Sequence, residues 1–345
     1  MPPVGVSRGS TSRAAAGLVL AAALLLSPAC ATINPPWQLA PPGGSADASV
    51  GTPAKPVHLA DVPFYPQDEY QCGPAALATV LVDSGVSTSP EALVPQVYLP
   101  GREGSLQLEL VAAMRRAGRI PYVVEPTTDA LLAELHAGRP VLVLQNLLVR
   151  SAPRWHYAVL VGTDPERNEV ILNSGTERGL QVAAPKFLRT WDWAGRWGLL
   201  ALRPGELPAH AEAVDYLAAV ADFEAVAGAE AAAPAYRAAI ERWPDDPRTH
   251  LALGNHAYGD GEHVEAAAHY RGGLALAPND PVLGNNYASV LGELGCTAEA
   301  RAALEIAQAG ATEGRWREQL AQTAAELASS KAERSPSCQT LTGAP

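Results

Sequence analysis

The chain has 345 residues, of which 48% are hydrophobic, and this is enough for two ordinary domains with sizeable cores. Its formal net charge of -11 argues against nucleic-acid binding, because the phosphate backbone would repel the protein. Only four cysteines occur, none at metal-knuckle spacing, so we expect no metal site and no cofactor.

The N-terminus has the pattern of an export signal, which we assign to residues 1–30. Arginines precede an apolar run at residues 14–26, which is too short to span a bilayer but suits a signal peptide. The run ends near Cys30 in a sequence that resembles a bacterial lipobox, so Cys30 is the predicted lipidation site. The alternative is ordinary cleavage within Ala-Cys-Ala at residues 29–31. Both alternatives predict export to the cell envelope, either anchored to the membrane and facing the periplasm or soluble in the periplasm.

Residues 31–56 are rich in Pro, Gly, Ala and Ser and read as a tether. A first folded unit is expected at 57–205. Its first helix should begin just after Cys72, because Pro74 suits a first turn, and should end near Gly85. Further elements are expected as helices at residues 105–116 and 128–137, and as strands at residues 120–125, 140–148, 156–162, 169–172 and 197–202. This order favours an α+β fold, with the tryptophans at positions 155, 191, 193 and 197 packed in its core.

A repeat follows from residue 213. Pro-Asp-Asp-Pro at 244–247 recurs as Pro-Asn-Asp-Pro at 278–281, which is the 34-residue period of tetratricopeptide repeats. We therefore predict three all-α repeats at 213–314, followed by a capping helix and a loose tail at 315–345. Such repeats act either as a structural scaffold or as a groove for a peptide or protein partner, and the sequence leaves both open.

The strongest chemical signal lies around Cys72. A cysteine nucleophile must ionise, and a helix N-terminus favours the thiolate through its partial positive charge. Gly73 leaves room for the backbone to bend and for a substrate carbonyl to approach. The Cys72 N–H and the side chain of Gln67 are the predicted donors to the oxyanion.

A thiol nucleophile is usually paired with a histidine base, and that base needs an orienting group. His156 begins an apolar strand, and Asn173 ends the next one, where hairpin pairing should carry it back beside His156. Taken singly, each residue could have an ordinary structural role: Cys72 as an inert cysteine, His156 as a surface histidine and Asn173 as a turn residue. Their order, together with Gln67, favours a catalytic triad of Cys72, His156 and Asn173.

These segments resemble the papain-like bacteriocin-processing cysteine peptidases, which usually act on double-glycine leader peptides. The resemblance rests on Gln67, on Cys-Gly-Pro-Ala from Cys72, on Trp-His-Tyr-Ala-Val around His156 and on Asn173. Residues 93–107, LVPQVYLPGREGSLQ, are very similar to a stand-alone, exported, lipoprotein-like branch with C-terminal tetratricopeptide repeats. The resemblance implies Cys72 as nucleophile, His156 as base and Gln67 as oxyanion donor. Asn173 stands where the family usually has aspartate.

We therefore expect an α+β papain-like cysteine peptidase domain followed by an all-α tetratricopeptide-repeat domain. The expected activity is hydrolysis of peptide bonds in a protein or peptide substrate, with the repeats recruiting the substrate or a partner. One alternative is a non-catalytic binding module in an envelope complex, and another is an acyl transferase or amidase with the same triad. Cys296 and Cys338 are either free thiols or a disulfide, and an exported protein favours the disulfide.

Overall fold

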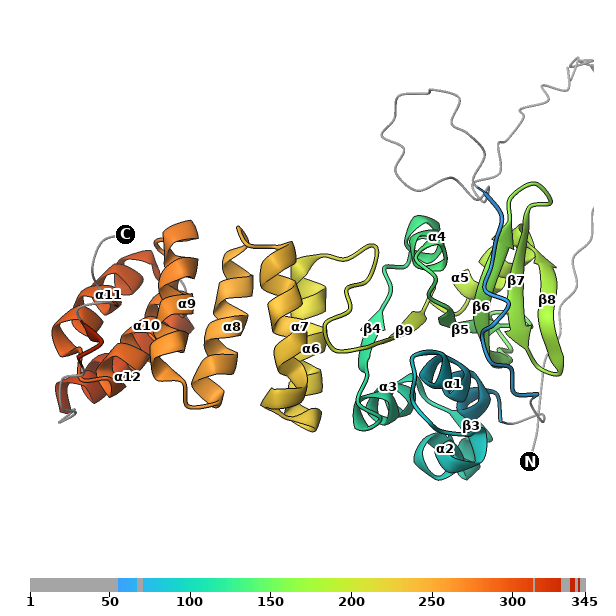
Figure 1. The fold of residues 1–345 in the computed structure, drawn as a ribbon, viewed down its shortest axis with the longest axis horizontal. Helices are drawn as coiled ribbons and strands as arrows, with labels where there is room; N and C mark the ends of the chain where they lie inside the picture. Colours follow the sequence, from blue (N-terminus) through green and yellow to red (C-terminus); the bar gives the residue numbers. More distant parts are fainter. Residues whose placement is uncertain (1–54, 67–70, 313, 330–335, 339–340, 342–345) are drawn as a thin grey trace, which may run out of the picture. The chain divides into compact units, whose positions relative to one another are not determined.

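The computed structural model describes residues 55–66, 71–312, 314–329, 336–338 and 341 (Figure 1). The signal peptide and nearly all of the tether predicted from the sequence therefore lie outside the described residues. Within the described part, no helix combines the length and the apolar character needed to cross a bilayer.

A seven-stranded antiparallel sheet forms the centre of the first half of the chain. Six strands follow the order β4-β9-β5-β6-β7-β8, and β1 pairs with the far end of β6. The strands are β1 (Val57–His58), β4 (Ile120–Val123), β5 (Val141–Asn146), β6 (Trp155–Asp164), β7 (Glu169–Ser174), β8 (Glu177–Ala183) and β9 (Gly198–Leu202).

Helices cover both faces of this sheet, and side-chain alternation along β6 defines the two faces. Tyr157 and Val159 pack on the face that carries the first three helices, whereas Ala158 and Leu160 pack on the other. The first face carries α1 (Cys72–Asp83), α2 (Pro90–Val97) and α3 (Gln107–Arg116), and the second carries α4 (Thr128–His136) and α5 (Ala184–Asp192).

A small hairpin lies against the start of α1. Its strands, β2 (Tyr98–Leu99) and β3 (Gly104–Ser105), are joined by a short 3-10 turn, and Glu103 adopts a left-handed backbone with φ 49°. A Cβ on Gly73 would lie 2.3 Å from the Ser105 Oγ, so only glycine lets the hairpin approach α1 this closely. The hairpin therefore forms a wall beside Cys72.

The second half of the chain is a stack of paired helices. The predicted 34-residue period corresponds to aspartate N-caps, since Asp246 and Asp280 each accept a backbone N–H just before a proline that begins a helix. The helices are α6 (Ala213–Ala227), α7 (Ala229–Arg242), α8 (Pro247–Gly259), α9 (His263–Leu276), α10 (Pro281–Glu293), α11 (Thr297–Gly310) and α12 (Gly314–Ser329).

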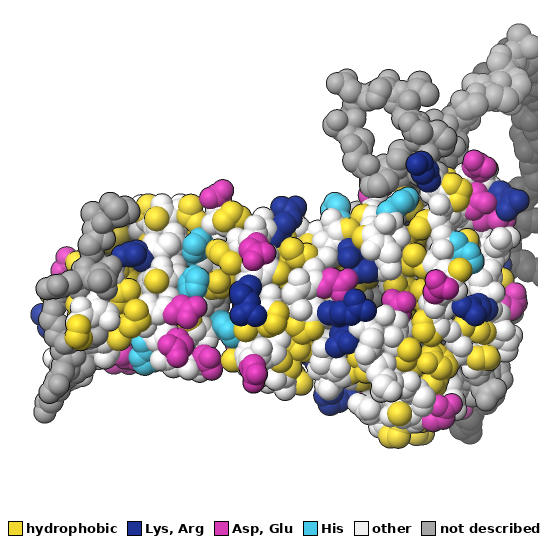
Figure 2. Space-filling view, viewed as in Figure 1, with side chains coloured by type: hydrophobic (Ala, Val, Ile, Leu, Met, Phe, Trp, Pro, Cys, Tyr) yellow, Lys and Arg dark blue, Asp and Glu magenta, His cyan; other side chains and the backbone are white. Residues whose placement is uncertain are grey.

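The sheet and the first repeat helices share one hydrophobic core. Tyr216 and Phe223 of α6 are fully buried in the same cluster as Ile120 of β4. The junction also contains an ion pair between Arg115 and Asp222. On the face shown in Figure 2, acidic and basic side chains intermix on the surface.

The C-terminal part folds back onto the last repeat. A disulfide joins Cys296 to Cys338, and both cysteines are completely buried in the core that α10 and α11 form. The sequence favoured this disulfide over a pair of free thiols, on the expectation that the protein is exported.

The sequence analysis did not predict α2, α5 or β8. Helix α5 carries local signals that could have revealed it, because proline stands in its first turn and Phe187 and Trp191 repeat at helical spacing. Strand β8 is partly exposed along its length and lacks the apolar run of β6. Its pairing with β7 makes it part of the sheet despite its polar sequence.

Candidate active site

Cys72 is the first residue of α1, and its side chain is partly buried. Burial raises the pKa of the Cys72 thiol above its ordinary value, although the backbone N–H groups of Tyr157, Gly73 and Cys72 itself favour the thiolate. The sulfur therefore lies against the start of β6, at the residue that follows His156. Its resting form is the neutral thiol.

A cavity of about 510 Å³ opens beside the sulfur. The β2–β3 hairpin lines one side with Ser105 and Leu106, and the start of β6 lines the other with Trp155 and Tyr157. Trp155 is 54% exposed, which corrects the expectation that it packs in the core, whereas Trp191 is fully buried. The cavity thus combines aromatic and apolar surface with the charged residues Arg102, Glu103 and Arg154, next to the only free cysteine of the described residues.

His156 lies at the same end of β6 and is held by a neighbouring strand. Its Nε2 is 2.8 Å from the Oγ of Ser174, the last residue of β7. Burial, with a smaller contribution from the nearby Arg154, lowers the pKa of His156 to about 4. The imidazole is therefore neutral near pH 7 in this arrangement.

Asn173 does not lie where hairpin pairing was expected to carry it. A β-bulge in β6 at Leu160–Gly162 shifts the register by one residue, so Asn173 pairs with Val159. Asn173 therefore lies on the opposite face from His156, where it donates to the Pro63 carbonyl at 3.4 Å and accepts the Gly179 N–H at 3.0 Å. The contact predicted for Asn173 is made by Ser174 instead.

The thiol and the imidazole belong to neighbouring segments, because the N–H that approaches the Cys72 sulfur is that of Tyr157, the residue after His156. The described residues include no hydrogen bond between Cys72 and His156. Because Nε2 of His156 is taken by Ser174, Nδ1 is the nitrogen left for Cys72.

Two of the predicted site residues, Gln67 and Cys30, lie outside the described residues. Ser105, which sequence reasoning did not consider, has a buried Oγ that makes no hydrogen bond with any described residue. Its backbone carbonyl accepts the Tyr157 hydroxyl at 3.3 Å. Ser174 was also missed. Its only sequence signal is its place directly after Asn173, and the choice between the two depends on strand register.

Comparisons with known proteins address both halves of the chain. A model of the Peptidase_C39 like family matches residues 59–196, and a tetratricopeptide-repeat model matches residues 228–281. The chain is similar to a structure described as a C39-like peptidase from Bacillus anthracis, at 17% identity and TM-score 0.36, over 42% of this chain and 96% of that chain. It is also similar to a double glycine motif protease from an AMS/PCAT transporter, solved with the leader peptide, at 21% identity and TM-score 0.32, over 42% and 95%. No curated protein matches it.

The two family matches fall on the two halves that the fold distinguishes. The first covers five of the seven strands of the sheet and the helices α1 to α5, and the second lies within the helical stack. The prediction of an α+β domain followed by an all-α repeat domain is therefore confirmed. The chain carries a C39-like peptidase domain followed by tetratricopeptide repeats.

Proposed function

We propose that this protein is a cysteine peptidase that hydrolyses peptide bonds with Cys72 as the nucleophile and His156 as the base. The observation that carries the proposal is the position of Cys72. It begins a helix, lines a substrate-sized cavity and lies against the residue next to His156. A cysteine at a helix N-terminus and a histidine on the adjoining strand, in a C39-like domain, are the residue types that this chemistry requires.

The proposed reaction begins from a neutral thiol and a neutral imidazole. Nδ1 of His156 removes the proton from Cys72 as the sulfur attacks the substrate carbonyl carbon, while the Nε2–H donates to Ser174. The Cys72 N–H, with Gln67 as a second donor, stabilises the tetrahedral oxyanion. His156 then protonates the leaving amine, and the C–N bond breaks. A water, deprotonated by His156, hydrolyses the thioester and frees the acid product.

Ser174 and Asn173 take different roles in this proposal. Ser174 orients the imidazole through Nε2, which is the role that sequence reasoning assigned to Asn173. Asn173 acts as a positioning residue, since its side chain ties the β7–β8 hairpin to Pro63. Asn173 would then affect catalysis only through the placement of Ser174.

We further propose that the enzyme works in the bacterial cell envelope, attached through a lipid on Cys30. The support is the sequence of the N-terminus, with its apolar run and its lipobox-like ending. The repeats would recruit a protein substrate or partner to the peptidase domain, which is consistent with the match to a tetratricopeptide-repeat model.

A second candidate function is a non-catalytic binding module. It is favoured by burial, which keeps both Cys72 and His156 neutral, and by the lack of a hydrogen bond between them among the described residues. In this alternative the cavity beside Cys72 binds a peptide without cleaving it. The acyl transferase or amidase alternative shares the dyad and differs only in the acceptor or the substrate.

A peptide library made by digesting a whole proteome tests the proposal against a wide range of substrate sequences. We expect the wild-type protein to create new peptide termini, detected by mass spectrometry, and Cys72→Ala to create none. The control is an unchanged melting temperature for Cys72→Ala, because this small substitution removes only the sulfur. If both proteins leave the library unchanged, or if Cys72→Ala cleaves equally, the peptidase proposal is contradicted.

A further inference from the structure

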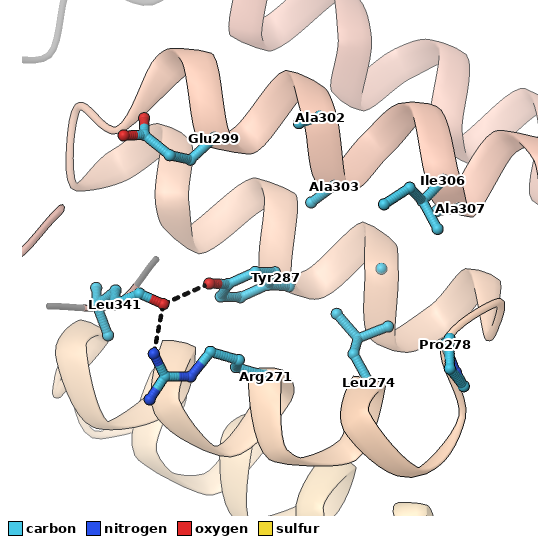
Figure 3. A pocket seen from close by; sticks show the side chains of 11 residues that line it. Arg271, Leu274, Pro278, Tyr287, Glu299, Ala302, Ala303, Ile306, Ala307 and Leu341 are labelled. Carbon is cyan, nitrogen blue, oxygen red and sulfur yellow. Dashed lines mark hydrogen bonds between the residues drawn. The ribbon is translucent and has the colours of Figure 1, made fainter. Parts of the chain in front are cut away.

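The repeat domain contains a cavity of its own, far along the chain from Cys72. It has a volume of about 410 Å³ and lies between α9 and α11, the second helices of two successive repeats, with α10 between them (Figure 3). Leu274 faces it from α9, and Ala303 and Ile306 face it from α11. Ile306 is 52% exposed, so this apolar surface is open to solvent.

One end of the cavity is polar, and the chain's own tail occupies it. The backbone carbonyl of Leu341 accepts hydrogen bonds from Nη1 of Arg271 at 2.7 Å and from the Tyr287 hydroxyl at 3.0 Å (Figure 3). Leu341 is 4% exposed and belongs to the core of the last repeat. Two donors converging on one carbonyl beside a buried aliphatic residue form a recognition site for a peptide.

The tail reaches this position because it is covalently fastened nearby. The disulfide between Cys296 and Cys338 places Leu341 three residues after a buried anchor. The Leu341 N–H also donates to the Ser337 carbonyl at 3.0 Å. A short tether of this kind gives the tail an effective concentration on the order of millimolar at the site.

We propose that the cavity between α9 and α11 is a binding site for a short, helical, aliphatic peptide segment of another protein, and that the tail at Leu341, itself helical, is its intramolecular competitor. The partner segment places a backbone carbonyl on Arg271 and Tyr287 and an aliphatic side chain against Leu274 and Ile306. The tail supplies the evidence for this chemistry, since it already makes the polar half of the contact. This site is independent of the activity at Cys72.

The test uses the tail as a probe in trans. The probe is a fluorescent peptide with the sequence of residues 336–345 and Cys338→Ser, and its binding is measured by anisotropy. We expect the probe to bind weakly to the wild-type protein, because the protein's own tail competes for the site. It should bind about tenfold or more tightly to the Leu341→Asp protein, which keeps the disulfide but whose tail no longer competes. The double variant Leu341→Asp/Tyr287→Phe should lose most of this gain, because the probe carbonyl then loses one donor.

A control peptide with aspartate in place of Leu341 should not bind to any of these proteins. Circular dichroism must show that Leu341→Asp keeps its helices. If it does not, a chain ending at residue 335 with Cys296→Ser replaces it, with the same expectation. Equal binding of the probe to the wild-type protein and to the folded, tail-released variant would overturn the proposal. Binding that is insensitive to Tyr287→Phe would overturn it as well.

Discussion

The candidate dyad combines two residues that are both neutral at rest. Burial raises the pKa of Cys72 and lowers that of His156, so the separated charges of a thiolate and an imidazolium are disfavoured together. Proton transfer must then accompany attack on the substrate. The N–H groups of Tyr157, Gly73 and Cys72 lower the cost of forming the thiolate, because they point at the place where its charge develops.

The depressed pKa of His156 predicts that acid destabilises the protein through this residue. The unfolded chain binds a proton near pH 6.5, whereas folded His156 does so only near pH 4. Stability is therefore lost as the pH falls through this window, by about 2–3 kcal/mol at the acid end. We expect urea unfolding to show that His156→Gln is less sensitive than the wild-type protein between about pH 7 and pH 4.5. A stability difference between the two proteins that stays constant over this range would contradict the assignment.

The arrangement of the site depends on the register between strands β6 and β7. The bulge in β6 at Leu160–Gly162 inserts a residue before the hairpin closes, and without it Asn173 would pair with Leu160, on the face of His156. Gly162 makes the close pairing with β1 possible, since a Cβ there would lie 2.3 Å from the Val57 carbonyl oxygen. The bulge thus exchanges Asn173 for Ser174 beside the imidazole.

Substitutions at these two neighbouring positions should separate catalysis from stability. Ser174→Ala removes the oxygen that orients His156, and we expect kcat to fall roughly tenfold or more with little change in melting temperature. Asn173→Ala leaves the partly buried Gly179 N–H and Pro63 carbonyl without their partner, and we expect a stability loss of about 1 kcal/mol. Steady-state kinetics and thermal melting measure both effects. The opposite pattern, with kcat lost only in Asn173→Ala, would restore Asn173 as the orienting residue.

Local signals predicted the elements of the site better than their pairing. The start of α1 near Cys72 follows from Pro74 and from the apolar spacing behind it. The strands that carry His156 and Asn173 follow from their apolar runs. Their register does not follow, because a single inserted residue reverses which side chains face each other. The role of Ser174 could therefore be read only from the three-dimensional arrangement.

At the scale of the whole described chain, the peptidase and repeat halves are linked by a continuous core. Tyr216 of α6 is completely buried, and its hydroxyl donates to the Glu206 carbonyl at 3.1 Å, just after the last strand of the sheet. The 34-residue period predicted the repeats themselves, because it records helix caps and tight helix crossings. It carries no information about the sheet residues against which α6 packs, so the shared core was not anticipated.

Truncation of a buried side chain in this shared core should destabilise the peptidase half and the repeat half together. Phe223 is fully buried in the cluster that includes Ile120 and Leu202. We expect Phe223→Ala to cost about 3–5 kcal/mol and to lower the melting temperature of the whole chain in a single calorimetric transition. Val226→Ala, a substitution on the same helix at an exposed position, is the matched control. Two separate transitions, with only one displaced by Phe223→Ala, would show that the halves fold independently.

The central claim is that Cys72 acts as a nucleophile assisted by His156, and covalent labelling by a peptide electrophile measures this directly. Incubation with a peptidyl vinyl sulfone library followed by intact mass analysis should give one adduct, which peptide mapping places on Cys72. The adduct should form at least about tenfold more slowly in His156→Ala, because the base that ionises the thiol is gone. Labelling of Cys72 at the same rate in both folded proteins, or no labelling of the wild-type protein, would contradict the account.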